Sequence, residues 1–374
     1  MGPQPEYSVD EPVRLLEGND LKALAKYMKS DSCRNVFLML GAGVSTSAGI
    51  PDFRSPETGS GCNDPGLYAN LARLKLPYPE AVFQIDFFRR NPVPFYTLAK
   101  ELYPGRFRPT PAHSFIKVLH EHSLLHTCFT QNIDTLERRA GVPGEKIIEA
   151  HGSFATQRCI DCKRPYDDEK IKRAVINSDI PRCERCNGLV KPDIVFFGEA
   201  LPVQFHTSIR SLRDADLLIV MGTSLTVHPF ASLVGLVPKG CPRVLINLDE
   251  VGNFSRLDDL VLLGKCDDIV RELCRELGWE EELDREWEAT ADSVEGEDRL
   301  PVSENEGEEK VSDELDRITK DIEKSLAISE GTSSPGPDAD KPEEKTKDKD
   351  NEGKDPLDKN GLEQEVPLAS EGKL

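Results

Sequence analysis

The chain has 374 residues, enough for one large domain or two, and a formal net charge of −20. Residues 291–374 hold 26 acidic and 12 basic side chains, a net charge of −14, which leaves −6 for residues 1–290. This acidity argues against nucleic acid as the main ligand. No apolar run reaches the roughly 18–20 residues that cross a bilayer, so we expect no membrane partner.

The first ten residues, MGPQPEYSVD, lack the basic start and apolar stretch of a signal peptide. We therefore expect a cytoplasmic protein, with the nucleus as a second location. In that setting the ten cysteines are expected to be reduced thiols or metal ligands.

The first predicted element is a helix over residues 12–30. Apolar side chains from Val13 to Tyr27 roughly follow helical spacing. Gly18 and Asn19 interrupt the pattern.

A buried strand is predicted at Val36–Leu40, followed by the glycine loop GAGVSTSAGIPDFRS at 41–55. Gly41 and Gly43 have no Cβ and let the backbone approach a ligand closely. Ser45–Ser47 can cap a helix start, whose free N–H groups hold phosphate. The glycine spacing departs from G-x-G-x-x-G, and an ordinary tight turn is the alternative on the glycines alone. An acid, an aromatic and an arginine in the same turn favour a nucleotide site; they are Asp52, Phe53 and Arg54.

Short helices are predicted between 56 and 110, where prolines and aromatics are frequent. With the loop at 52–66 they form a helical insert of about 52–110 beside the nucleotide site. A helix at Thr110–Leu125 leads into the next strand.

Further apolar runs each end in a small or polar cluster. Strands interleaved with helices predict an α/β fold, a Rossmann-like parallel sheet with helices on both faces. Ligands of such sheets bind at the carboxyl ends of the strands, so the clusters should converge on one crevice. The runs are 127–130, 147–150, 194–197, 217–221 and 244–246, followed by 131–134, 151–152, 198–199, 222–224 and 247–249.

Two cysteine pairs, Cys159-x2-Cys162 and Cys183-x2-Cys186, are separated by twenty residues. This spacing predicts a closed tetrahedral Zn²⁺ site with a structural role, and it disfavours four unrelated thiols. The zinc module, about 155–192, is an excursion from the nucleotide domain. The other six cysteines are expected to be ordinary thiols: Cys33, Cys62, Cys128, Cys241, Cys266 and Cys274.

After Trp279 the apolar content falls, and we expect the chain to become disordered. The predicted domains are a catalytic domain at 1–290 and an acidic tail at 291–374. Within the tail, residues 311–329 carry an apolar stripe at helical spacing and predict a helix. An isolated helix is marginal in water and needs an apolar partner, so we expect this one to return to the catalytic groove. The alternatives are a solvated, transient helix and a binding site for another protein.

Several motifs follow one another between about Asp31 and Trp279. They are GAGVSTSAGIPDFRS, TQNIDTLERRAG, EAHGSF, both cysteine pairs, KPDIVFFGEALP, VMGTSLTVHPFASL and GKCDD. In this order they resemble the sirtuins, NAD-dependent protein deacylases, and are most similar to the cytosolic class I members, including fungal homologues with acidic tails. The resemblance implies a large dinucleotide-binding domain and a smaller zinc-and-helix domain, between which NAD and an acyl-lysine peptide meet.

The chemistry that the resemblance implies is acetyl transfer from lysine to ADP-ribose, with release of nicotinamide and O-acetyl-ADP-ribose. The transfer needs a base with a pKa near neutrality. His151 fits this role, because it alone among the seven histidines stands between an apolar strand and a glycine; a structural imidazole is the alternative. The resemblance adds Asn132 as a catalytic residue. The other histidines except His228 are expected on the surface or on helix faces: His113, His120, His122, His126 and His206.

The resemblance also implies the ligand contacts. For NAD they are Gly41, Ala42, Gly43, Ser45, Thr46, Gly49, Ile50, Asp52, Phe53, Arg54, Gln131, Asn132, Asp134, Gly222, Thr223, Ser224, Asn247, Asp249 and Cys266. For the substrate they are Ile133, Val195, Phe196, Gly198 and Glu199, and alternate residues of the IVFF run should serve the core and the substrate.

The expected partners are proteins with acetylated lysines, such as histone tails. Two other function classes remain open at this point. One is a module that binds acyl-lysine without chemistry, and the other is a protein mono-ADP-ribosyltransferase. Nicotinamide release with an acetylated peptide separates the first from a deacetylase, and NAD label retained on protein would indicate the second.

Overall fold

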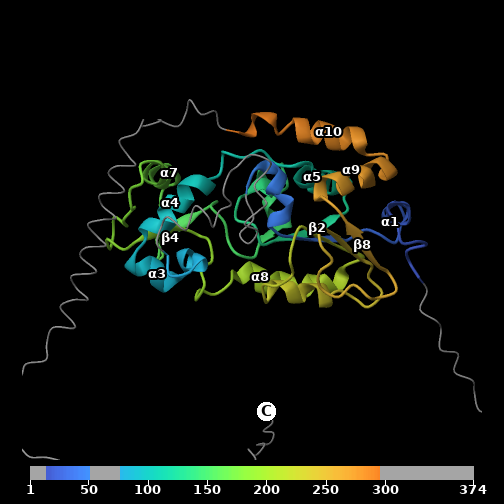
Figure 1. Ribbon diagram of the computed structural model, residues 1–374, viewed down its shortest axis with the longest axis horizontal. Helices are drawn as coiled ribbons and strands as arrows, with labels where there is room; N and C mark the ends of the chain where they lie inside the picture. The colour runs from blue at the N-terminus through green and yellow to red at the C-terminus, as the bar shows by residue number, and fades with distance from the viewer. Residues whose placement is uncertain (1–13, 51–75, 295–374) are drawn as a thin grey trace, which may run out of the picture. The chain divides into compact units, whose positions relative to one another are not determined.

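A six-stranded parallel sheet forms the centre of the computed structural model, which describes residues 14–50 and 76–294 (Figure 1). The strand order is β3-β2-β1-β6-β7-β8, and every neighbouring pair is parallel. This confirms the predicted fold class. The strands are β1 (Val36–Leu40), β2 (Leu125–Thr130), β3 (Ile147–Glu149), β6 (Leu217–Met221), β7 (Arg243–Asn247) and β8 (Asp259–Leu263).

The two central strands, β1 and β6, are buried along their whole length. Their sequences, VFLML and LLIVM, are apolar at every position because helices cover both faces of the sheet. In Figure 1, α5 (Pro111–Glu121), α9 (Cys266–Leu277) and α10 (Glu280–Glu288) lie above the sheet, and α8 (Val203–Ser208) lies below it.

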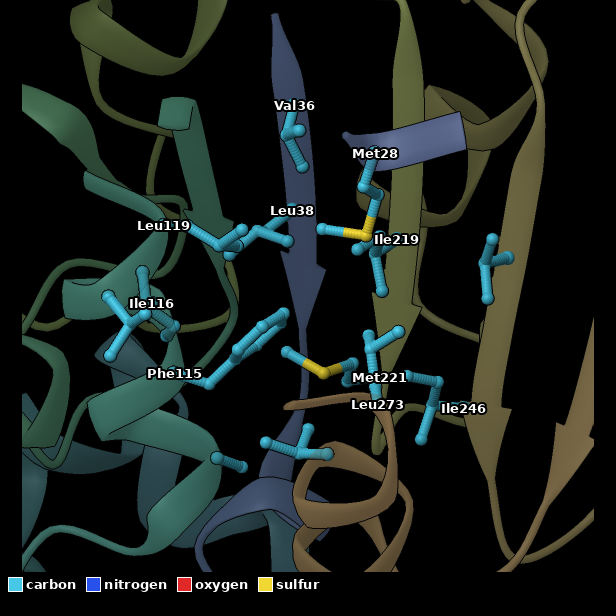
Figure 2. Close-up of a cluster of buried hydrophobic side chains, with 14 of the residues drawn as sticks. Met28, Val36, Leu38, Phe115, Ile116, Leu119, Ile219, Met221, Ile246 and Leu273 are labelled. Carbon is cyan, nitrogen blue, oxygen red and sulfur yellow. The ribbon is translucent and has the colours of Figure 1, made fainter. Parts of the chain in front are cut away.

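Alternate residues of β1 therefore face different cores. Leu38 packs with Phe115 of α5, Ile219 of β6 and Leu273 of α9 (Figure 2). Phe37 instead joins the core on the other face of the sheet. Side chains pack against both faces of the sheet, and this packing holds in place the loops that follow the carboxyl ends of the strands.

A smaller module with its own core carries the zinc segment and the predicted short helices. Its centre is a cluster of aromatic rings that includes Phe88, Phe95 and Phe196. The short helices predicted in the insert are confirmed from residue 79 onward; residues 51–75 lie outside the described part. The elements are η3 (Pro79–Phe83), α3 (Ile85–Arg90), α4 (Val93–Leu102), β4 (Gln157–Cys159), α7 (Asp168–Ile176) and β5 (Val190–Pro192).

None of the described helices has the length and apolar character to cross a membrane. The remaining described elements are short. They are α1 (Leu21–Met28), η1 (Ala42–Val44), η2 (Thr46–Ala48), α6 (Leu136–Arg139), η4 (Gly144–Lys146), η5 (Ile209–Asp214), η6 (Phe230–Gly235) and η7 (Ala291–Ser293).

The first helix is shorter than predicted. It starts at Leu21, because the Asp20 side chain accepts a hydrogen bond from the Ala23 N–H at 2.8 Å and caps the helix. The preceding residues form bends instead, and the N–H groups of Leu15 and Leu16 both donate to Asp258 Oδ1 at 2.9 Å.

The expectation of disorder directly after Trp279 is wrong, because α10 and η7 follow it. Leu283 of α10 is fully buried, and Trp287 of the same helix donates from Nε1 to the Pro109 carbonyl at 3.0 Å. These contacts hold a helix whose composition is strongly acidic. The predicted tail helix, 311–329, lies outside the described residues.

Two strand predictions also need correction. The run 194–197 is not a strand of the sheet; it lies beside the smaller module, where Phe197 forms a single bridge with Gln84. Conversely, β8 was not predicted, although it pairs with β7 over five residues.

Candidate active site

The glycine loop after β1 meets the end of β6 at contact distance. The Gly41 N–H donates to the Met221 carbonyl at 3.1 Å, and the Gly43 N–H donates to the Gly222 carbonyl at 2.8 Å. A Cβ on Gly41 would lie 2.6 Å from Thr223 Cβ. The close approach of the two segments requires glycine here. The glycines that were expected to admit a ligand thus also bring two segments of the chain together.

The loop does not start an α-helix within the described residues, which end at Ile50 in this segment. Two 3₁₀ turns, η1 and η2, occupy 42–48 instead. Gly49 has a φ of +92°, in the left-handed region, and so ends the second turn. Asp52, Phe53 and Arg54 lie outside the described residues.

A polar network joins this loop to the residues after β2. Ser45 Oγ donates to Asp134 Oδ2 at 2.7 Å. Asn132 Nδ2 donates to the Gly41 carbonyl at 3.2 Å and to Ser45 Oγ at 3.3 Å. Burial raises the pKa of Asp134, while hydrogen bonds from the Leu136 N–H and from Ser45 oppose the rise. The network fixes two polar side chains beside the loop.

The same network includes a histidine on the buried face of α5, whose contact with the loop was not expected from the sequence. His113 is fully buried, with Nε2 3.5 Å from Ser45 Oγ. Its Nδ1 accepts a hydrogen bond from the Thr110 N–H at 3.2 Å. Burial lowers the pKa of His113 to about 3, so the ring is neutral. The available sequence signal was its position three residues after Thr110, the N-cap of α5.

His151 lies two residues after the end of β3 and is partly buried. Its Nδ1 lies 3.1 Å from the Gln131 carbonyl oxygen. A carbonyl only accepts, so Nδ1 carries the proton and Nε2 is the basic nitrogen. Burial lowers the His151 pKa, and the hydrogen bond to Gln131 partly offsets this. The imidazole is thus a neutral base held in one tautomer.

The loops after β6, β7 and β8 complete this edge. Gln131 Nε2 donates to Thr223 Oγ1 at 2.8 Å, linking β2 to β6. Asn247 Nδ2 donates to the Asp249 carbonyl at 2.8 Å. Cys266 at the start of α9 is buried with its thiol directed to the Ile246 carbonyl at 3.7 Å, and burial raises its pKa to about 12. Within the described residues, all the predicted NAD contacts therefore lie at or after the carboxyl ends of strands.

A pocket opens between this edge and the smaller module. Leu102 of α4 lines it, a residue that the sequence analysis missed because a helical leucine looks like any core residue. The full lining is Ala42, Ser45, Ile50, Leu102, Asn132, Ile133 and Asp134.

The IVFF run alternates as predicted: Ile194 and Phe196 are buried, Val195 is partly buried and Phe197 is 58% exposed. The ring centroid of Phe196 lies 5.0 Å from that of Phe95. The Phe196 side chain therefore belongs to the aromatic core and offers no surface to a substrate. We call residues 193–199 the substrate segment.

The substrate segment adjoins the base, since the Val195 N–H donates to the His151 carbonyl at 2.7 Å. The Gly198 backbone is exposed, with a φ of +94°. Glu199 Oε2 pairs with Lys191 Nζ at 2.9 Å.

The four predicted metal ligands come together in the smaller module. The Sγ atoms of Cys159, Cys162, Cys183 and Cys186 all lie within 4.8 Å of one another. Cys159 is the last residue of β4, and the antiparallel partner strand β5 follows the second cysteine pair in the chain. Four thiolates leave no open coordination position, so this is a structural zinc site. The five other cysteines among the described residues are buried thiols; Cys62 lies outside them.

Known proteins are similar to this chain in sequence. The NAD-dependent protein deacetylase hst2-1 of Emericella nidulans is 54% identical over 333 residues, 88% of this chain and 90% of the relative. Sirtuin-2 of Danio rerio is 49% identical over 72% of this chain and 75% of its own length. The hst2 deacetylase of Schizosaccharomyces pombe is 49% identical over 71% of this chain and 78% of its own length.

The model of the Sir2 family matches residues 41–229, from the glycine loop through the zinc module to the loop after β6. The relatives cover more than two thirds of the chain at 49–54% identity. The chain belongs to the Sir2 family.

Proposed function

We infer that this chain is an NAD-dependent protein deacetylase, which transfers an acetyl group from lysine to the ADP-ribose part of NAD and releases nicotinamide. Relatives that cover most of the chain at about 50% identity are named NAD-dependent protein deacetylases, as the sequence predicted. The observation that carries the inference is the convergence of Asn132, Asp134 and His151 on the edge where the glycine loop meets β6.

NAD supplies an activated ribose carbon that can accept the acetyl oxygen. The residues of the chain bind and orient the reactants. We assign the pyrophosphate to the glycine loop and to Gly222–Ser224, where backbone N–H groups and closely approaching glycines can accommodate it. Asn132 and Asp134, held by Ser45, orient the ribose beside the pocket.

His151 acts as the general base in this proposal. Its Nε2 takes the proton of a ribose hydroxyl, which makes that oxygen a better nucleophile toward the acetyl carbon. The hydrogen bond from Nδ1 to Gln131 holds the ring in the tautomer that this step needs. The apolar pocket wall formed by Ile50, Leu102 and Ile133 excludes water from the reacting centre.

The direct test is mass spectrometry of acetylated peptides incubated with the enzyme, with and without NAD. The expected result is loss of one acetyl group per peptide only with NAD, accompanied by nicotinamide and O-acetyl-ADP-ribose. The matched control is the His151→Ala variant. Radiolabel from the adenylate part of NAD retained on the peptide would instead indicate mono-ADP-ribosylation, and binding without nicotinamide release would indicate a module without chemistry.

We further propose that the substrates are lysine-rich segments such as histone tails. The support is electrostatic: residues 1–290 carry a net charge of −6, which favours a basic peptide. Such substrates fit a cytoplasmic protein that also enters the nucleus. Deacetylation of acetyl-lysine peptides that differ only in flanking residues, lysine against glutamate, tests this; equal kcat/KM for both would reject it.

A second proposed partner is the chain's own tail. The support is the apolar stripe Val311, Leu315, Ile318, Ile322 and Leu326, which lies outside the described residues. We propose that it competes with peptide or NAD for the pocket. Truncation after Val294 keeps every described element and should lower the KM for a short peptide; unchanged kinetics would remove the proposal.

A further inference from the structure

A buried lysine lies directly before the substrate segment. Lys191 is the middle residue of β5, and its side chain is only 6% exposed. Its ammonium group is engaged three times: Nζ lies 2.6 Å from the Ile194 carbonyl, 3.3 Å from the Pro192 carbonyl and 2.9 Å from Glu199 Oε2. An ammonium group has three N–H donors. All of them have an acceptor, which a charge at this depth requires.

Glu199 continues the connection back into the same segment. The oxygen that pairs with Lys191 also accepts a hydrogen bond from the Phe196 N–H at 3.0 Å. The Glu199 N–H in turn donates to the Phe196 carbonyl at 2.9 Å. Lys191 Nζ also lies 4.5 Å from the centroid of the Phe196 ring. One ammonium group thus contacts the beginning, the middle and the end of the turn formed by residues 194–199.

The opposite side of this turn adjoins the active site. The Val195 N–H donates to the His151 carbonyl at 2.7 Å. Next to it, the Phe197 N–H donates to the Phe83 carbonyl at 2.8 Å, and the Phe197 carbonyl accepts from the Ile85 N–H at 3.3 Å. The position of the turn relative to His151 therefore depends on these backbone hydrogen bonds and on the ion pair between Lys191 and Glu199.

We propose that Lys191 is a positioning residue for the acetylated peptide: its ion pair with Glu199 holds the substrate segment in the conformation that receives the peptide beside His151. This inference rests on the proposed assignment of that segment to the substrate. A buried ion pair contributes little net stability compared with apolar residues, but it fixes geometry, because leaving either charge unpaired is costly. Without the ammonium group, the Ile194 carbonyl and the Glu199 carboxylate lose their shared partner.

The test is a double-mutant cycle in the full-length chain. Lys191→Met keeps an unbranched side chain that is one heavy atom shorter and removes the charge. We expect the KM for the acetylated peptide to rise roughly tenfold to a hundredfold, because small displacements of positioning groups have effects of that size. The KM for NAD and the zinc content should stay unchanged, since the Lys191 side chain contacts neither the glycine loop nor the cysteines within the part of the chain that the structure describes.

Glu199→Gln keeps an acceptor oxygen for the Phe196 N–H and removes the negative charge. The double variant Lys191→Met/Glu199→Gln should bind peptide better than Lys191→Met alone, because no unpaired buried charge remains. If Lys191→Met is insoluble, Glu199→Gln and the double variant still give the comparison of peptide KM against NAD KM. A peptide KM that equals the wild-type value, or that changes in step with the KM for NAD, overturns the proposal.

Arg158→Gln is the matched control. Arg158 also pairs with an acid of the segment, since its Nε and Nη2 lie 2.6 and 2.7 Å from the carboxylate oxygens of Asp193, but its side chain is 50% exposed. A pair whose arginine is half exposed, at the start of the segment, should leave the peptide KM unchanged. An equal effect of Arg158→Gln and Lys191→Met would show general loosening of the module and would contradict a specific role for Lys191.

A photo-crosslinking side chain at position 197 separates this proposal from the one on which it rests. Phe197 is 58% exposed, so a benzoyl group there is accessible. We expect it to crosslink an acetylated peptide in the parent enzyme and to lose most of the yield when combined with Lys191→Met. No crosslink in the parent would overturn the assignment of the substrate segment together with this inference. A full yield in the Lys191→Met background would overturn the role of Lys191 alone.

Discussion

The substitution Gly43→Ala tests how tightly the glycine loop must pack against β6. A Cβ on Gly43 would lie 2.7 Å from Gly222 Cα and 2.9 Å from the Gly222 carbonyl oxygen. Unbonded carbon atoms sit at about 3.5–4.0 Å, so the two segments must separate by about 1 Å. Gly43 is not among the glycines with positive φ, and alanine can adopt its backbone conformation. The cost is therefore steric.

The size of the effect follows from two contacts. Forcing a methyl group into a packed contact costs about 1–3 kcal/mol. Separation by that amount also breaks the 2.8 Å hydrogen bond from the Gly43 N–H to Gly222, worth about 1 kcal/mol. We expect the free energy of unfolding to fall by about 2–4 kcal/mol and turnover to fall by about a hundredfold, since the loop positions the reactants.

The assay combines urea unfolding without NAD and calorimetric titration with NAD. The control is Gly235→Ala, because a Cβ at Gly235 meets nothing within 4 Å. Its free energy of unfolding should stay within about 0.5 kcal/mol of the wild-type value. A Gly43→Ala protein that unfolds at the wild-type midpoint and binds NAD with wild-type affinity would refute the reasoning.

Three other predictions concern different parts of the site. His151→Ala should keep NAD binding but lose roughly 10²–10⁴-fold in deacetylation rate. In the wild type the neutral imidazole is the active form, and burial lowers the pKa of His151. The deacetylation rate should therefore fall as the pH drops through a midpoint below about 6.5. A midpoint above neutrality would contradict the assignment. Cys183→Ser should release zinc and unfold the smaller module, measured by metal content and circular dichroism, and a soluble, zinc-free, fully active variant would exclude a structural site. Asp267 accepts hydrogen bonds from Ser47 Oγ and from the Ala112 N–H. Asp267→Ala should therefore raise the KM for NAD about fivefold for each hydrogen bond of about 1 kcal/mol that is lost, and leave the KM for peptide unchanged. An unchanged KM for NAD would argue against this contact.

The sequence by itself determined the parts whose signals are local. The runs VFLML and LLIVM are apolar at every position and too short for a buried helix, so they predict the central strands of a parallel sheet, where the structure has β1 and β6. The spacing of two cysteine pairs predicts a zinc site, because the ligand geometry is set within each pair. The order of the motifs identified the family and the enzyme class before any contact was known.

Other features depended on contacts between distant residues. The IVFF run has a strand-like alternation, yet its buried residues pack in the smaller module, since periodicity says which side chains are buried but not against which core. The acidic composition of α10 gave no sign of a helix in the sequence. Its stability depends on the tertiary contacts of Leu283 and Trp287.

The site divides in the same way. His151 and Asn132 stand in recognisable motifs, whereas His113 looks like an ordinary helix residue until the fold brings its ring beside Ser45, 68 positions earlier in the chain. The pairing of Lys191 with Glu199 likewise depends on the turn between them. A sequence pattern reports the environment of a residue averaged along its own element, but hydrogen bonds and ion pairs act over about 3 Å and therefore depend on how the elements pack in three dimensions.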